Sequence, residues 1–361
     1  MEGHPNAYDR FFFNGYREDF YFALALGLYP NRGVIDAAFS VVVDGQQFSV
    51  FASDALVGRP TSVGPIAIII EEPLRVNRIV VDAPEHGLRA ELTYTQLTAT
   101  IEEPRQTMHD GNRIFMDVTR ATQIGTWSGW IETPAGRMEI DGLLGTKDRS
   151  WGVRPVGDAV PGAPTTRPLQ LAFFWAPVWL NGEGRHYMSF RDAAGNVLSA
   201  SAGILPLAAT GEASHVGGDL VIVWEPGTRW SRSATMTVGE SRYTLTPLVR
   251  FHMRGVGYGH PLFAHGRWHG GPIVAGETLT TANVDAADYF SLHVQQVVRV
   301  EGEGVSGVGI FEQLLVGPYA LGGFSELLDG APPSANSSID VSRKVLTRQH
   351  SPEEYICNND N

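Results

Sequence analysis

The sequence predicts an all-β protein of two tandem antiparallel barrels with few short helices. Apolar and polar residues alternate with period two along most of the chain, which is typical of half-buried strands. Turn signals such as Asp44-Gly45 separate the apolar runs at short, regular intervals. The 41 glycines and 22 prolines suit many tight turns. Because strands joined by tight turns form up-and-down sheets, which remove their edges by closure, we expect barrels.

The first half is expected to hold seven to nine strands. Residues 34–43 and 47–52 form a hairpin, and residues 88–101 form an alternating, threonine-rich strand. Residues 17–27 are either one short helix or the first strand, because the run is rich in aromatic residues. The other expected strands are residues 67–70, 78–81, 113–119, 123–132 and 137–144.

A stretch rich in proline and glycine, residues 154–168, predicts a domain boundary. We place an N-terminal barrel at residues 1–160, a C-terminal barrel at 161–330 and a tail at 331–361, with a helix at 338–348. The strands expected in the second barrel are residues 169–175, 185–191, 197–204, 235–238, 241–254, 277–282, 289–300 and 307–316.

Composition restricts the class of protein. Hydrophobic residues make up 43% and charged residues 18%, which supplies a sizeable core and argues against disorder. The net charge of −12 argues against a nucleic acid partner, because phosphate binding needs clustered lysine and arginine. The single cysteine, Cys357, cannot form an internal disulfide. It also cannot supply a cysteine-rich metal site.

The expected location is the cytoplasm, without an integral membrane segment. The first residues lack the basic-then-apolar order of a signal peptide. The apolar run at residues 20–29 is too short to span a bilayer. The sequence leaves the oligomeric state open, and a homodimer is one of the arrangements it allows.

The first segment with chemical interest is residues 145–154, which joins Asp148, Arg149 and Trp151 at the end of a strand. Tryptophan supplies an apolar wall and an indole donor. Beside such a wall, desolvation would raise the pKa of Asp148 and make it a general acid. The alternative is structural: an ion pair of Asp148 with Arg149 or Arg154 that closes the mouth of the barrel.

The second segment, residues 254–269, combines glycines with three histidines. It is not a phosphate loop, because the Lys-Ser/Thr ending is absent and no strand leads into a helix. Proline and glycine deny the helical spacing of a common zinc site. The histidines are therefore interpreted as proton donors of a pocket or as packing residues. The members of interest are His260, His265 and His269, with Tyr258 and Trp268 beside them.

A third group lies on strands of the second half. Alternation places Phe173 and Trp175 on one face of their strand, and His293 shares a face with Gln295. Glu312 stands in an apolar strand, where a carboxylate is costly unless it is paired or functional. The alternative for Glu312 is a salt bridge to an arginine of a neighbouring strand.

The run Lys147-Asp148-Arg149-Ser150-Trp151-Gly152 resembles the Asp-x-x-Trp-Gly signature of the AttH-like and carotenoid 1,2-hydratase-like superfamily. The runs 255–261 and 307–312 also look like bacterial members of this group. The resemblance implies two lipocalin-like barrels with a hydrophobic, often isoprenoid, ligand in or between them. Related members protonate and hydrate a terminal double bond, and others cyclise polyenes. Asp148 and Trp151 match the signature, but Arg149 stands where the group often has histidine.

The leading hypothesis is therefore a cofactor-free acid/base enzyme, a hydratase, dehydratase, isomerase or cyclase of an apolar, terpenoid-like molecule. One alternative is a carrier that binds a hydrophobic ligand without catalysis. A second is a metal-dependent hydrolase that uses His260, His265 and His269. For the enzyme, the expected catalytic residues are Asp148, His260, His265 and Glu312. The expected substrate-binding residues are Arg149, Trp151, Phe173, Trp175, Tyr258, Trp268 and His293.

Overall fold

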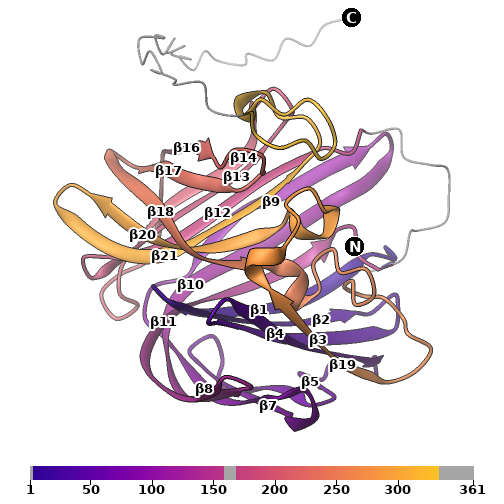
Figure 1. Ribbon diagram of the computed structural model, residues 1–361. Coiled ribbons are helices and arrows are strands. Elements are labelled where there is room, and N and C mark those ends of the chain that lie inside the picture. The colour runs from indigo at the N-terminus through magenta and orange to yellow at the C-terminus, as the bar shows by residue number, and fades with distance from the viewer. Residues whose placement is uncertain (1–2, 158–167, 333–361) are drawn as a thin grey trace, which may run out of the picture.

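The computed structural model describes residues 3–157 and 168–332 and contains two antiparallel sheets (Figure 1). The fold prediction is confirmed: the protein is all-β, with two tandem lipocalin-like barrels. Within the described residues, no helix is long and apolar enough to cross a membrane. The described helices are short 3₁₀ turns: η1 (Pro84–His86), η2 (Met253–Val256), η3 (Thr281–Asn283), η4 (Tyr289–Ser291) and η5 (Ala320–Gly322).

The larger sheet has 12 strands in the order β19-β4-β3-β2-β1-β11-β10-β8-β7-β6-β5, and β9 pairs with β10 beside this path. The sheet curls around an apolar core of its own. Its strands are β1 (Ala7–Arg17), β2 (Phe20–Tyr29), β3 (Val34–Val43), β4 (Gln46–Ala55), β5 (Ser62–Val63), β6 (Ile66–Glu72), β7 (Val76–Ala83), β8 (Leu88–Gln96), β9 (Ile101–Asp110), β10 (Arg113–Thr133), β11 (Gly136–Val153) and β19 (Ile273–Thr280).

The second sheet has nine strands in the order β15-β14-β13-β12-β21-β20-β18-β17-β16. Its two edge strands, β15 and β16, follow one another in the chain with only Gly217 between them, so the barrel is nearly closed. Its strands are β12 (Leu171–Leu180), β13 (Glu183–Arg191), β14 (Val197–Leu205), β15 (Ser214–Val216), β16 (Gly218–Trp224), β17 (Ser231–Val238), β18 (Ser241–His252), β20 (Val294–Gly302) and β21 (Val305–Val316).

Three apolar cores result from strand alternation. Phe13 and Phe22 face the inside of the N-terminal barrel, and Phe174 and Phe311 face the inside of the C-terminal barrel. The alternate residues of the same strands meet in a third core between the two barrels, which we call the junction layer. β1 and β2 bury both of their faces. The sequence of β2 is apolar almost throughout, whereas β1 also buries Arg10 and Asn14.

A row of glycines makes room for the aromatic centre of the N-terminal core. Gly15, Gly145 and Gly125 lie side by side on β1, β11 and β10. A Cβ atom at Gly145 would lie 2.2 Å from both the indole nitrogen of Trp127 and the carbonyl oxygen of Asn14. Those two atoms are joined by a hydrogen bond of 2.8 Å. Glycine at this position therefore keeps the Trp127 ring in place.

Some strand predictions need correction. The helix alternative for residues 17–27 is wrong, because the chain turns at Glu18 and Asp19 between β1 and β2. The run 88–101 is two strands, β8 and β9. The runs 113–119 and 123–132 are one strand, β10, which continues through the partly buried Arg120 and the buried Thr122. β11 continues to Val153, and β20 begins only at Val294.

The expected domain boundary at residue 160 lies outside the described residues, as do Cys357 and the expected helix at 338–348. The chain nevertheless crosses between the barrels far beyond this point. Residues 253–280 leave the C-terminal barrel and run over β3 and β4, and β19 then pairs with β4 (Figure 1). On that path, Gln47 exchanges two hydrogen bonds with the backbone of His252.

We predict that Gly145→Ala destabilises the protein by roughly 1–3 kcal/mol, because the added methyl group displaces the Trp127 indole from a packed core. Urea unfolding would measure the loss. The matched control is Gly271→Ala, since a Cβ atom there meets nothing within 4 Å. Equal unfolding midpoints for the two variants would contradict this role of the glycine row.

Candidate functional site between the barrels

Charged side chains gather in the junction layer, where apolar residues would be expected. Asp148 on β11 and Arg120 on β10 point into it from the N-terminal barrel, and Glu312 points into it from β21. Glu103 reaches it from β9, the strand that leaves the N-terminal barrel and packs against β14. The walls of the layer are aromatic and include Phe12, Phe173 and Trp175.

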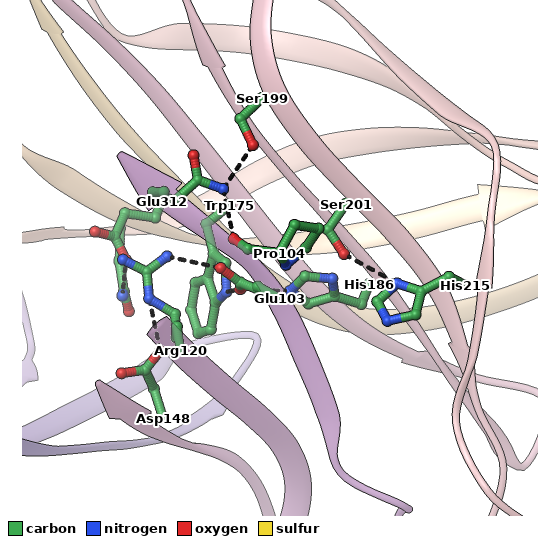
Figure 2. A network of polar contacts seen from close by, with 12 residues as sticks. Glu103, Pro104, Arg120, Asp148, Trp175, His186, Ser199, Ser201, His215 and Glu312 are labelled. Carbon is green, nitrogen blue, oxygen red and sulfur yellow. Dashed lines mark hydrogen bonds and ion pairs between the residues drawn. The ribbon is translucent and has the colours of Figure 1, made fainter. Parts of the chain in front are cut away.

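Arg120 is the common cation of this cluster. Its Nε atom lies 3.0 Å from Oδ2 of Asp148, and its Nη1 atom lies 3.3 Å from Oε2 of Glu103 (Figure 2). The charge of Glu312 also acts on Arg120. The guanidinium group lies over the Phe173 ring, 5.0 Å from its centroid. Arg120 therefore neutralises part, but not all, of the negative charge around it.

Glu103 is held as a carboxylate. The indole nitrogen of Trp175 donates to its Oε1 atom at 3.2 Å, and Nε2 of His186 lies 3.0 Å from the same oxygen. Burial opposes the charged form, but the charge of Arg120 and the hydrogen bond with His186 outweigh it. The pKa of Glu103 is therefore lowered, and this carboxylate fixes the orientation of Trp175.

The pKa of Asp148 is shifted in the opposite direction to that of Glu103. Burial raises its pKa to about 7, against the charge of Arg120 and with the help of the nearby charges of Glu103 and Glu312. Its side chain is only 10% exposed. Of the carboxyl groups around Arg120, Asp148 is therefore the one that holds a proton near neutral pH.

Glu312 heads a chain of polar groups that crosses the junction layer. His293 Nε2 and Gln295 Nε2 each lie 2.6 Å from one of its oxygens. Gln295 in turn accepts hydrogen bonds from Tyr21 and from Asn14. Burial opposes the charge of Glu312, but hydrogen bonding by His293 and Gln295 outweighs it, so the pKa of Glu312 is lowered.

Tyr258 links this chain to the histidine segment. Its ring meets His293 edge-on at 4.6 Å and His265 edge-on at 4.8 Å. Burial, together with the charges of Arg10 and Arg154, holds the pKa of His265 well below its usual value. His265 is therefore a neutral imidazole, and its Nδ1 atom lies 3.6 Å from Asp36.

The structure thus brings together seven of the expected site residues: Asp148, Phe173, Trp175, Tyr258, His265, His293 and Glu312. The ion-pair alternative for Asp148 also occurs, but with Arg120 in place of Arg149 or Arg154. The partner of Glu312 is His293 on the neighbouring chain segment, whereas an arginine was expected. No salt bridge joins Glu312 directly to an arginine among the described residues.

The other expected residues lie elsewhere. His260 organises its own loop, because its Nδ1 atom accepts from the backbone of Leu262 and Phe263. Arg149 points to the opposite face of β11, over the Phe11 ring, and pairs with Asp9. The two tryptophans are on the surface, with Trp151 37% and Trp268 46% exposed.

The three histidines expected as an alternative metal site turn to different partners. His260 packs on Phe51 and Phe263, His265 on Tyr258, and His269 on Phe263. Within the described ranges, no three His, Cys, Asp or Glu side chains converge as metal ligands.

A groove of about 750 Å³ opens beside the junction layer. Tyr16, Leu144 and Val308 belong both to its lining and to the junction core, so the groove reaches that core. Asp148 lies opposite Phe12 on β1. Phe12 is four residues from Tyr16, a separation of about 13 Å along the strand at the usual rise per residue. The volume is within the range of small-molecule sites, roughly 300–1,000 Å³.

Sequence reasoning missed several residues of this layer, above all Arg120, Glu103 and His186. Arg120 could have been found, because it lies at even spacing from Thr122, the residue that pairs with Asp148 across β10 and β11. Glu103 could not have been found from the sequence, because its position depends on the packing of β9 against the other barrel.

The chain belongs to a family of unknown function, DUF8625, whose model matches residues 1–325. No curated protein matches it. Among solved structures, kievitone hydratase from Nectria haematococca has a TM-score of 0.52 at 10% identity and covers 87% of this chain and 90% of its own. The structure of CghA with Sch210972 has a TM-score of 0.47 at 12% identity and covers 86% of this chain and 89% of its own. The likeness to kievitone hydratase is one of fold alone.

We predict that Asp148 makes stability depend on pH between about 4 and 7. Its native pKa of about 7 exceeds the unfolded value of about 3.9, so the native state binds the extra proton in this window. Its contribution is fully present below pH 4 and is lost as pH rises to 7. Relative to Asp148→Asn, the wild type should lose up to about 4 kcal/mol over this window.

Urea unfolding of both proteins at pH 4.5, 6 and 7.5 would test this expectation. The control is Asp82→Asn, an exposed carboxylate on β7 that pairs with Arg89. A wild type that gains stability over Asp148→Asn with rising pH would show that Asp148 is ionised in the native state.

Proposed function

We propose that the protein is an acid/base enzyme that acts, without a cofactor, on the carbon–carbon double bond of an apolar small molecule between its barrels. The observation that carries the proposal is the opposite perturbation of carboxyl groups around Arg120. The pKa of Asp148 is raised, whereas those of Glu103 and Glu312 are lowered. Titratable groups whose pKa values are pushed apart in one site supply an acid and a base.

In this proposal Asp148 is the acid. It transfers its proton to one alkene carbon, and the positive charge develops on the other. The aromatic faces of Phe173 and Trp175 stabilise that charge by cation–π contact. Glu312, oriented by His293 and Gln295, is the base. It takes a proton from an attacking water in hydration, or from a neighbouring carbon in double-bond migration.

The fold supports this proposal from a second direction. A solved structure of similar fold is titled as a hydratase, and the Asp148-to-Gly152 run matches the signature expected of hydrating relatives. In this chain the position after Asp148 is Arg149, which faces away from the junction layer. A histidine there would not reach the site, so the departure from the signature leaves the proposed acid intact.

The test is deuterium transfer from solvent to carbon. Wild-type protein is incubated in D₂O with a panel of isoprenoid alkenes and their tertiary alcohols, and mass spectrometry measures deuterium bound to carbon. Wild type should label at least one member. Asp148→Asn should label it on the order of 10²-fold or more slowly, since a positioned acid contributes at least that much.

The control is again Asp82→Asn, which should label at the wild-type rate because the residue is far from the junction layer on an exposed strand face. Labelling by Asp148→Asn at the wild-type rate would show that the acid is another group. Binding of panel members, seen by native mass spectrometry, with no labelling by wild type would support the carrier alternative.

A further inference from the structure

A pair of buried arginines lies beside the carboxylate cluster. Arg10 on β1 is 1% exposed, and its three guanidinium nitrogens have no hydrogen-bond partner among the described residues. The Nε and Nη2 atoms of Arg154, just after β11, are also buried without a partner, while a side-chain hydrogen bond with Tyr258 helps to raise the pKa of Arg154. Arginine stays protonated in proteins, so both groups carry charge inside the molecule.

Arg229 shows what a structural arginine of this protein looks like. It is also 1% exposed, but its guanidinium group donates to Asp329 and to the backbone oxygens of Gly317, Glu326 and Asp329. Burial of a charge is costly unless hydrogen bonds and an opposite charge compensate it. Arg229 meets both parts of this condition within the protein, whereas Arg10 has the charges of Asp36 and Asp148 nearby but no hydrogen-bond partner among the described residues.

The surroundings of the two arginines are aromatic. Both guanidinium groups lie over the ring of Tyr258, at 4.3 Å for Arg10 and 5.3 Å for Arg154. Arg154 also lies over Tyr8, at 4.5 Å. The nearby carboxyl group of Asp36 accepts hydrogen bonds from the backbone amide of Gly266 and the hydroxyl of Tyr29.

We propose that Arg10 and Arg154 form the binding site for the carboxylate of an apolar ligand, with Tyr258 as the floor beneath both guanidinium groups. Guanidinium groups bind carboxylates through paired, charge-assisted hydrogen bonds. The inference rests on the proposed function in one respect: it takes this ligand to be the substrate of the proposed enzyme. It narrows the substrate class from apolar molecules to apolar carboxylic acids.

The order of residues on β1 fits a ligand of this kind. On the junction face of β1, Arg10 is followed by Phe12, which lies opposite Asp148, then by Asn14 and then by Tyr16. Of these residues, Tyr16 lines the groove. Arg10 and Phe12 are about 7 Å apart along the strand, and Arg10 and Tyr16 about 20 Å. A carboxylate at Arg10 thus places an apolar body past Asp148 and toward the groove.

The experiment compares decanoate with decanol, which shares the apolar body but lacks the charge, by calorimetric titration at pH 8. Wild type should prefer decanoate. Arg10→Met should weaken decanoate binding on the order of tenfold or more, with decanol binding unchanged, because only the charge-assisted contact is lost. Without a ligand, Arg10→Met should lower Tm less than Arg229→Met does, because Arg10 has no hydrogen bonds within the protein to lose.

The matched control is Arg229→Met, which should lower Tm and leave the preference for decanoate intact, since it breaks satisfied hydrogen bonds far from this site. Arg154→Met provides a second variant with the expected loss of decanoate binding. Equal binding of decanoate and decanol by wild type would overturn the proposal, as would a drop in Tm for Arg10→Met like that of Arg229→Met.

Deuterium labelling of the isoprenoid panel, extended by unsaturated isoprenoid carboxylic acids, separates this proposal from the acid/base function. Labelling by wild type without any preference for decanoate overturns the carboxylate site alone. A preference for decanoate that depends on Arg10, without labelling, overturns the acid/base function and supports the binding site.

Discussion

Burial of both faces of β1 and β2 is the constraint on which the rest of the structure depends. One face fills the N-terminal barrel and the other is covered by the C-terminal barrel, so most of the layer between them is buried. In such a layer an ionised group is stable only with compensating partners. The chain nevertheless places carboxyl and guanidinium groups there, and the way each is compensated distinguishes their roles.

Arg120 shows how one cation can set several protonation states. It contacts Asp148 and Glu103 directly and acts on Glu312 through space. Glu103 and Glu312 have additional donors, whereas burial dominates at Asp148. The same low-dielectric layer therefore contains a carboxylic acid and carboxylates within reach of one guanidinium group. This separation arises from the donors around Glu103 and Glu312 and from the charges of these two groups, which oppose ionisation of Asp148.

The sequence predicts the fold well, because period-two alternation and turn residues act locally. It also singles out Asp148, from the Asp-Arg-Trp run at the end of a strand, and Glu312, from a carboxylate in an apolar strand. The structure places both in the junction layer. Alternation would further have separated Asp148 from Arg149 and Trp151, which lie at odd spacing from it. Glu103 depends on the packing of β9 against another barrel, and the state of Arg10 depends on which acceptors are absent around it. Neither property is encoded in neighbouring residues.

The pairing of β19 with β4 has a consequence for how the protein can be divided. A fragment that ends near residue 160 contains β4 but not its outer neighbour, and would present a long row of free backbone donors and acceptors to solvent. Free edges of this kind join to other chains. A fragment that begins there would carry residues 253–280 without the surface they cover. The two barrels are successive in the chain, but β19 and the residues before it join the second to the first, so dividing the chain near residue 160 leaves both parts incomplete.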